Sequence, residues 1–215
     1  MHTRRVIDRL IRNGTTVSAD STHHAVFPVA VSAAEGEALK RWVVREKATC
    51  TIEVGLGYAV SALYIIEGLM SNGGEVRHVA MDPNQATRFG NCGLQAIEEA
   101  GATRRLEFHA VESQIVLPWL LGEGRTFDLA FIDGNHRFDG VFVDLVYLGR
   151  LVKRGGIIFV DDYQLPGIAR AVSFFVTNLN WVIEETSREE EFHHWVVLRT
   201  ATAPDNRPFT HFVDF

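Results

Sequence analysis

TIEVGLGYAVSA, residues 51–62, joins a strand-like stretch to a helix-like stretch through two glycines, Gly55 and Gly57. Glycines at such a turn let the backbone approach a ligand closely, and the helix N-terminus that follows favours negative charge. The same kind of turn also occurs for packing alone. A third glycine three residues after Gly57 would indicate a dinucleotide, but Val60 stands there, which disfavours that ligand.

Strand and helix patterns alternate along most of the chain, which indicates a mostly parallel sheet covered by helices on both faces. The predicted strands are 51–54, 76–81, 106–110, 127–132 and 157–160, and the predicted helices between them are 60–70, 86–100, 113–121 and 138–152. Ahead of them, Ser32 and Glu35 have the spacing of a capping box, which begins a helix that ends near Arg45.

The pattern changes after the fifth of these strands. Residues 166–179 have a helical pattern, and residues 181–184 and 195–199 have strand patterns joined by the charged turn SREEE, residues 187–191. This spacing suits an antiparallel hairpin at one edge of the sheet. We therefore predict an α/β fold with a doubly wound, mostly parallel, seven-stranded sheet and a C-terminal antiparallel hairpin.

Length and composition favour a single domain, since 215 residues at 47% hydrophobic content can bury a full core. Its expected parts are a helical lead or lid at 1–47, a core at 48–200 and a tail at 201–215. In the lead, Val6, Ile7, Leu10 and Ile11 share one helical face, which predicts a docking helix, with a transit peptide as the alternative. The phenylalanines of the tail are expected to dock on this subunit or on a partner subunit.

Charge and cysteine content exclude several classes of partner. The formal net charge of -6 and the mixing of both signs offer no basic stripe for nucleic acid. No apolar run approaches the roughly 20 residues that span a bilayer, so no membrane partner is expected. Two cysteines, Cys50 and Cys92, make no disulfide framework, which favours the cytoplasm. The sequence leaves a homodimer open.

Two acids accompany the glycine turn. Glu53 lies inside an apolar strand, where a buried carboxylate is costly unless a cationic or donating group meets it. A sulfonium cofactor with an amino group would be such a partner. Asp82 follows the second strand, where an acid can bond the ribose hydroxyls of a nucleoside, although a lone acid there is often a helix cap.

These stretches resemble the class I S-adenosylmethionine (SAM)-dependent methyltransferases, and within them the metal-dependent O-methyltransferases of the catechol, caffeoyl-coenzyme A, macrolide and sugar types. The resemblance covers about residues 31–163. It is carried by VSAAEGEAL, TIEVGLGYAVS, AMDPN, FDLAFIDGNH and GGIIFVDDY. It implies a Rossmann-like methyltransferase fold and SAM as cofactor.

The resemblance also implies residue roles. The residues that it places around SAM are Glu53, Gly55, Gly57 and Ser61 at the methionine part, Asp82 at the ribose, Glu112, Ser113 and Gln114 near the adenine, and Asp133 beside the cofactor. Ala59 stands where many members have glycine. Where the catechol branch has lysine, three residues after the strand-end aspartate, this chain has His136, as in the natural-product branch.

Asp133, Asp161 and Asp162 follow the fourth and fifth predicted strands. Neighbouring strands lie roughly 4.8 Å apart, so the three carboxylates should converge at one rim and repel one another unless a proton or a cation intervenes. Oxygen ligands suit Mg²⁺, and the sequence has no zinc-type Cys/His spacing. The alternative is that the acids cap turns and bond loop amides.

A cation at these three acids could hold two adjacent oxygens of an acceptor, with Asp133 and His136 as the catalytic residues and His136 as the general base. We therefore predict a SAM-dependent O-methyltransferase acting on a small catechol-like, sugar or polyketide hydroxyl. The rival predictions are a nicotinamide-dependent oxidoreductase and an inactive cofactor-binding assembly partner. The other paired histidines, His23 with His24 and His193 with His194, are expected to be loop or structural residues.

Overall fold

The computed structural model describes residues 2–187 and 193–215. The chain divides into two compact units, Met1–Ser113 and Gln114–Phe215, called the N-terminal and C-terminal units below. The division at Ser113 matches neither expected boundary, near residues 47 and 200, and the single-domain organisation stays a prediction. Within the described ranges, the strands form a two-stranded sheet and a seven-stranded, mostly parallel sheet, which confirms the predicted fold class.

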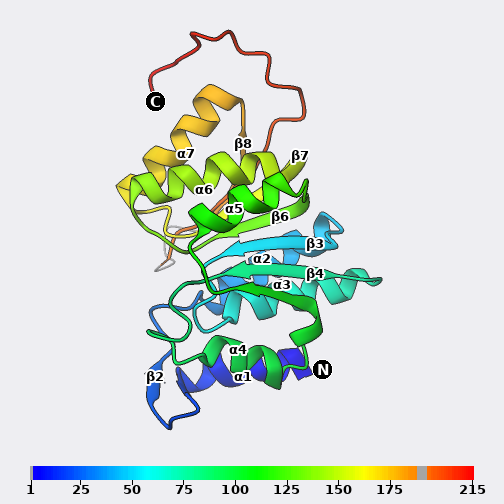
Figure 1. The fold of residues 1–215 in the computed structure, drawn as a ribbon, viewed down its shortest axis with the longest axis vertical. Helices are drawn as coiled ribbons and strands as arrows, with labels where there is room; N and C mark the ends of the chain where they lie inside the picture. Colours follow the sequence, from blue (N-terminus) through cyan, green and yellow to red (C-terminus); the bar gives the residue numbers. More distant parts are fainter. Residues whose placement is uncertain (1, 188–192) are drawn as a thin grey trace. The chain divides into compact units, whose positions relative to one another are not determined.

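The N-terminal unit contributes three parallel strands to the larger sheet, in the order β5-β4-β3. Its elements are α1 (His2–Asn13), β1 (Thr15–Val17), β2 (His23–Ala25), α2 (Ala33–Arg45), β3 (Cys50–Val54), α3 (Val60–Asn72), β4 (Arg77–Met81), α4 (Cys92–Glu99), η1 (Thr103–Arg105) and β5 (Leu106–His109). Helix α3 is buried on almost every side because it packs on β3 and β4 and also against α1 and α2 (Figure 1).

The sequence accounts for both helices that precede the larger sheet, α1 and α2, through an apolar face and a capping residue. Ser32 caps α2, since its hydroxyl accepts a hydrogen bond from the Glu35 backbone N–H at 3.1 Å. Helix α1 buries Val6, Ile7 and Leu10, and it packs against α3 and α4. The predicted docking face is therefore confirmed within the N-terminal unit.

Two local features of this unit differ from the prediction. The helix expected from residue 86 begins only at Cys92, because Gly90 and Asn91 adopt φ angles of 54° and 57°, which no right-handed helix accommodates. The short hairpin of β1 and β2 was not predicted. Its strands have three residues each and are mostly exposed, so they carry no apolar pattern.

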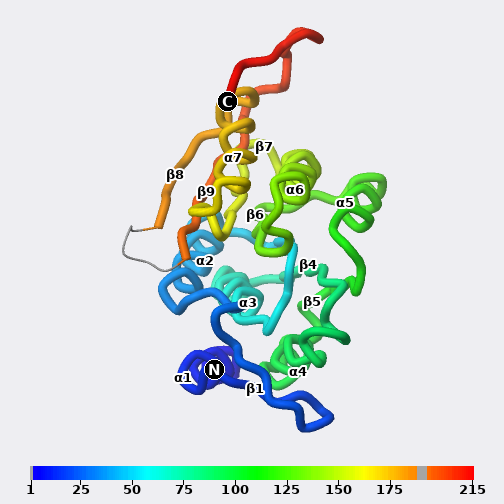
Figure 2. The backbone as a smooth tube through the Cα atoms, turned by 90° about the vertical axis from the view of Figure 1, so that its left-hand side faces the viewer, coloured from blue at the N-terminus to red at the C-terminus, as the bar shows by residue number. Residues whose placement is uncertain are grey.

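The C-terminal unit orders its strands β6-β7-β9-β8. Its elements are α5 (Ser113–Gly122), which begins at the last residue of the other unit, β6 (Phe127–Ile132), α6 (Phe138–Leu151), β7 (Val152–Val160), α7 (Pro166–Leu179), β8 (Val182–Thr186) and β9 (Val196–Arg199). Strands β6 and β7 are parallel, whereas β9 is antiparallel to both β7 and β8. Helices α6 and α7 pack against each other (Figure 2).

The predicted edge hairpin is thus confirmed as β8 and β9, while residues 188–191 of its predicted turn lie outside the described residues. Strand β7 begins earlier than the predicted residue 157. Its pairing with β6 shifts between Phe127 and Leu129, and Gly155 adopts a φ angle of 71°. The first residues of β7, before the apolar run, are therefore irregular.

The C-terminal tail docks on α7 through Asn178. The Asn178 amide donates to the Val213 carbonyl at 2.9 Å and accepts from the Val213 N–H at 2.8 Å. Phe215 stacks edge-on against Phe174, with ring centroids 5.0 Å apart, which confirms the expected docking for this phenylalanine. Phe209, by contrast, is fully exposed.

No helix within residues 2–187 and 193–215 combines the length and the apolar character needed to cross a bilayer.

Candidate active site

The glycine turn of the N-terminal unit is tied to the end of β4. Gly55 donates its N–H to the Met81 carbonyl at 2.9 Å, and Gly57 donates to Asp82 Oδ2 at 2.9 Å. Both glycines have positive φ angles, of 94° and 49°, which require glycine or a strained residue. Ala59, at the predicted departure from the family pattern, adopts a left-handed φ of 62° and begins α3 without a side-chain cap.

The Asp82 carboxylate is buried and already accepts three hydrogen bonds. The donors are the Gly57 N–H, the Asn84 N–H at 2.8 Å and the Gln85 side-chain amide at 3.1 Å. A carboxylate offers about four acceptor positions, so one position remains for a ligand donor. The predicted contact of Asp82 with the ribose hydroxyls stays a prediction. Gln85, which also donates to the Gly57 carbonyl at 2.6 Å, was not predicted.

Glu53 is fully buried, and protein groups bond both of its carboxylate oxygens. Ser61 donates its hydroxyl to Oε1, and His78 Nε2 lies 3.0 Å from Oε2. The other nitrogen of His78 lies 2.9 Å from the hydroxyl of Thr51. Because protein donors already offset the burial of Glu53, its position does not by itself require a cofactor, and contact of Glu53 or Ser61 with SAM stays a prediction.

His78 is the residue of this network that the sequence analysis missed. It lies on β4, and its pairing register places it directly beside Thr51 on β3. A lone histidine inside the apolar run of β4 was the only available signal. Such a histidine usually indicates nothing more than a satisfied core residue.

The three residues predicted to lie near the adenine follow β5. Ser113, the first residue of α5, is half-buried, while Glu112 and Gln114 are exposed. The division between the two units falls between Ser113 and Gln114. Their role stays a prediction.

The predicted acids of the C-terminal unit do converge. Ile132 pairs with Val160 in the parallel register of β6 and β7, so Asp133 and Asp161 leave their strands at the same end. Asp161 donates its N–H to the Ile132 carbonyl at 3.0 Å. Asp162 has a left-handed φ of 54° and donates its N–H to Asp161 Oδ1 at 2.6 Å. Asp161 and Asp162 are both buried.

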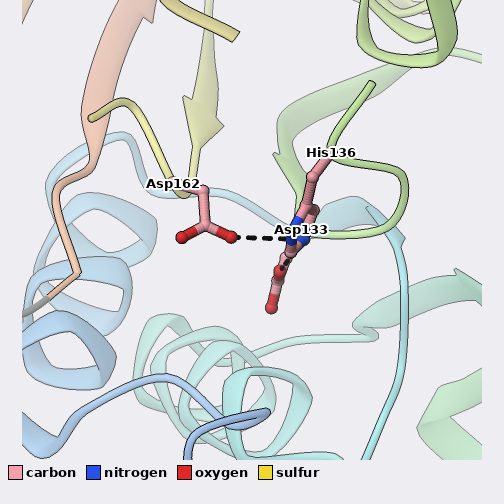
Figure 3. Close-up of side chains that lie close together, drawn as sticks. All are labelled: Asp133, His136 and Asp162. Carbon is pink, nitrogen blue, oxygen red and sulfur yellow. Dashed lines mark ion pairs between the residues drawn. The ribbon is translucent and has the colours of Figure 1, made fainter. Parts of the chain in front are cut away.

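His136 joins this cluster from the loop after β6 (Figure 3). Its Nε2 lies 3.2 Å from Asp162 Oδ2 and 3.6 Å from Asp133 Oδ1, while about half of the side chain is exposed. The Asp133 carboxylate, followed by the charge of Asp162, raises the pKa of His136 above its ordinary value, against an opposing effect of burial. The imidazole is thus both accessible and held beside the acids.

His193 completes the cluster, although the sequence predicted only a structural role for it. Its Nδ1 lies 3.4 Å from Asp162 Oδ1, the same oxygen that accepts from the Gln164 side chain at 2.9 Å. No local motif identifies His193, because it reaches Asp162 only through the pairing of β9 with β7.

The donor set fits a divalent cation. Ligand atoms of Asp133, His136 and Asp162 lie within 4.8 Å of one another, as do those of Asp161, Asp162 and His193. Burial, followed by the charges of Asp133 and Asp162, raises the pKa of Asp161 from 3.8 to about 7. Crowded carboxylates of this kind are relieved by a proton or by a cation.

A comparison with protein-family models agrees with the arrangement of the glycine turn and the acids. A family model described as "Methyltransferase domain" matches residues 52–163, which include the end of β3, the glycine turn, β6 and the acids after β7. The chain belongs to this methyltransferase family. The predicted class I SAM-dependent methyltransferase is thereby confirmed.

Curated relatives of this methyltransferase are plant enzymes named for caffeoyl-CoA. Caffeoyl-CoA O-methyltransferase 1 from Nicotiana tabacum is 27% identical over 172 residues, covering 74% of this chain and 70% of the relative. Caffeoyl-CoA O-methyltransferase from Petroselinum crispum is also 27% identical over 172 residues, covering 74% of this chain and 69% of its own.

Solved structures share the fold at low sequence identity. An O-methyltransferase from Bacillus cereus in complex with SAH superposes with a TM-score of 0.74 and 15% identity, covering 91% of this chain and 90% of its own. The O-methyltransferase TomG from Streptomyces achromogenes, in complex with SAM, gives a TM-score of 0.72 and 16% identity, covering 93% and 89%. At these identities the likeness bears on the fold, which it confirms as the predicted Rossmann-like methyltransferase fold.

Replacing Asp82 with alanine should weaken SAM binding by about 1.5–3 kcal/mol, the usual worth of a hydrogen bond to a charged group. The change removes the carboxylate that is predicted to bind the ribose and also the bond that holds Gly57. Titration calorimetry would measure the affinity. Glu75→Ala, which removes an exposed acid of the same unit, is the matched control. Unaltered affinity in the Asp82 variant would refute the assignment.

Asp161 should make the cation-free methyltransferase less stable as the pH rises. Its carboxyl releases its proton near 3.8 in the unfolded chain and near 7 in the folded protein, so the folded state binds more protons between these values. The free energy of unfolding contributed by this group therefore falls from about pH 4 to about pH 7.

With chelator present throughout, the melting temperature of the Asp161→Asn variant should therefore fall less than that of the wild type as the pH rises from about 4 to about 7. Asp214→Asn, at an exposed tail residue, should follow the wild type. Parallel curves for wild type and Asp161→Asn would contradict the raised pKa.

Proposed function

We propose that this protein transfers the methyl group of SAM to a hydroxyl of a small molecule that carries two adjacent oxygens, with the aid of a divalent cation. The observation that carries this proposal is the convergence of Asp133, Asp162 and His136 at the ends of β6 and β7. The O-methyltransferase names of its relatives, which include caffeoyl-CoA enzymes, support an oxygen acceptor.

The cofactor side of the proposal rests on the N-terminal unit. The glycine turn, with Gly55 and Gly57, and the remaining acceptor position of Asp82 suit a nucleoside and the charged groups of an amino acid. SAM and SAH in the solved structures of similar fold support the same cofactor. We assign Glu53 and Ser61 to the methionine part, as the resemblance implies.

The remaining cofactor residues belong to the same proposal. We place Glu112, Ser113 and Gln114 beside the adenine and Asp133 beside the reacting end of the cofactor.

On the acceptor side, we assign Asp133, Asp161 and Asp162 to the cation, and carboxylate oxygens considered alone suit Mg²⁺. When bound, the cation would orient an acceptor oxygen and favour loss of its proton. His136 would accept that proton, since its imidazole is accessible and is held by two carboxylates. Asp133 would orient the imidazole for this step.

The direct test is turnover with SAM and a panel of catechols, sugars and polyketides, read by mass spectrometry as the gain of one methyl group. We expect a product with acceptors that carry two adjacent oxygens. A melting shift with SAM but no product from any acceptor would favour the rival function, a cofactor-binding assembly partner. A melting shift with NAD alone would contradict the SAM assignment.

A further inference from the structure

Asp162 lies between two imidazoles, one at each of its carboxylate oxygens. His136 Nε2 is 3.2 Å from Oδ2, and His193 Nδ1 is 3.4 Å from Oδ1. The Asp162 side chain is 9% exposed and that of His193 is 18% exposed, so this second contact is largely shielded from water. The proposed function uses His136 but gives His193 no part.

The position of His193 is fixed by its neighbours in the chain. Val196, at the start of β9, pairs with Val160 at the end of β7. His194 accepts from the Tyr163 N–H at 2.7 Å through its carbonyl, and it donates its N–H to the Gln164 side chain at 2.9 Å. These bonds hold the histidine pair against the loop that carries the acids, independently of any contact made by the His193 imidazole.

The spacing of the donor atoms suits a shared ion. One ligand atom from each of Asp161, Asp162 and His193 lies within 4.8 Å of the others. Neighbouring ligands of an octahedral ion with bonds of about 2.1 Å lie about 3 Å apart. The separation of 3.4 Å between His193 Nδ1 and Asp162 Oδ1 is close to that value, so the two groups can ligate one ion with little movement.

Imidazole nitrogen changes which ions such a site favours. Carboxylate oxygens alone suit Mg²⁺, whereas imidazole suits transition ions such as Co²⁺, Ni²⁺ and Zn²⁺. We infer that His193 is a nitrogen ligand of the cation at this centre and gives the centre a preference for first-row transition ions over Mg²⁺. This inference rests on the cation of the proposed function and names the residue that selects it.

The competing role for His193 is a hydrogen bond that merely orients Asp162. Asparagine separates the two roles, because its amide nitrogen comes near the place of imidazole Nδ1 and can still donate to Asp162, whereas the atom that it could offer a metal is a carbonyl oxygen. His193→Asn should therefore restore an orienting role and fail to restore a nitrogen ligand. His194→Ala is the matched control, since the hydrogen bonds of His194 described above come from its backbone.

Calorimetric titration with Co²⁺ and with Mg²⁺ gives the first measurement. We expect His193→Ala and His193→Asn to weaken Co²⁺ binding by at least about tenfold and to change Mg²⁺ binding by less than about threefold. His194→Ala should match the wild type for both ions. Full Co²⁺ affinity in the asparagine variant, or an equal loss for both ions, would overturn the inference.

Pulsed electron paramagnetic resonance of the Mn²⁺-loaded protein gives a second measurement that does not depend on activity. Coupling to a histidine nitrogen, identified by isotopic labelling of histidine, should be present in the wild type and absent from both His193 variants. It should persist in His136→Ala and His194→Ala. Coupling that survives loss of His193 would overturn the inference and assign the nitrogen ligand to another histidine. Coupling that is absent from the Mn²⁺-loaded wild type would overturn it and leave an oxygen-only centre in the proposed function.

Failure of wild-type protein to bind Mn²⁺ would overturn both this inference and the cation of the proposed function. SAM-dependent methyl transfer, measured on the same preparation in chelator, would then show whether the transferase activity itself survives.

Discussion

His136→Ala is expected to lower the catalytic rate by roughly 10²–10⁴-fold, the usual contribution of a positioned general base. The imidazole lies 3.2 Å from Asp162 and 3.6 Å from Asp133, and about half of the side chain remains exposed. SAM affinity should hardly change, because the glycine turn and Asp82 are held by bonds within the N-terminal unit. Single-turnover kinetics and calorimetry would separate the two effects.

The pH dependence of kcat/KM gives a second readout for His136. A general base works only when deprotonated, so the rate should rise with pH through the pKa of His136, which the neighbouring carboxylates raise. A bound cation acts in the opposite direction and brings that limb back toward neutral pH. The limb should flatten or move in His136→Ala and stay in place in His194→Ala. A full rate with an unchanged profile would reduce His136 to a loop residue.

Removal of divalent cations is expected to abolish turnover, and Mg²⁺ is expected to restore it. Without a cation, three carboxylates lie at the ends of the neighbouring strands β6 and β7, and the pKa of Asp161 is raised to about 7, so Asp161 is partly protonated near neutral pH. Such a cluster repels an acceptor that must itself become an anion. The assay is dialysis against chelator followed by titration of Mg²⁺, with product formation as the signal.

The control for this experiment is SAM affinity in chelator, which should be largely retained because Gly57 and Asp82 are held by protein hydrogen bonds. Asp133→Asn should reproduce the loss of turnover and resist rescue by Mg²⁺. Full activity after exhaustive dialysis, with chelator in excess, would instead support the turn-capping role of the acids.

Much of the fold could be predicted because buried strands are apolar. The runs that form β6 and β9 are apolar because they fill the core, so their composition identifies them as strands. The charged segment between β8 and β9 indicates where the chain reverses its direction. The start of α4 could not be predicted in this way. Gly90 and Asn91 determine where α4 begins because their backbone is left-handed. The spacing of apolar residues carries no information about backbone handedness.

The residues of the candidate site also divide into those that local sequence could predict and those that it could not. Asp133 and His136 were predictable because one short loop carries both, and parallel pairing then brings Asp161 to the same end. His78 and His193 were not, since each meets its carboxylate across a strand pairing between distant parts of the chain. A partner fixed by tertiary structure leaves no trace in local spacing.

The division of the chain at Ser113 has an evolutionary consequence. The glycine turn and Asp82 lie before this point, whereas Asp133, His136 and Asp162 lie after it. Under the proposed function, mutations in the later stretch that spare Gln114 and Asp133 can alter which molecule is methylated while most of the residues assigned to the methyl donor are inherited unchanged. Hybrids of related chains joined near Ser113 would test whether the choice of acceptor follows the later stretch.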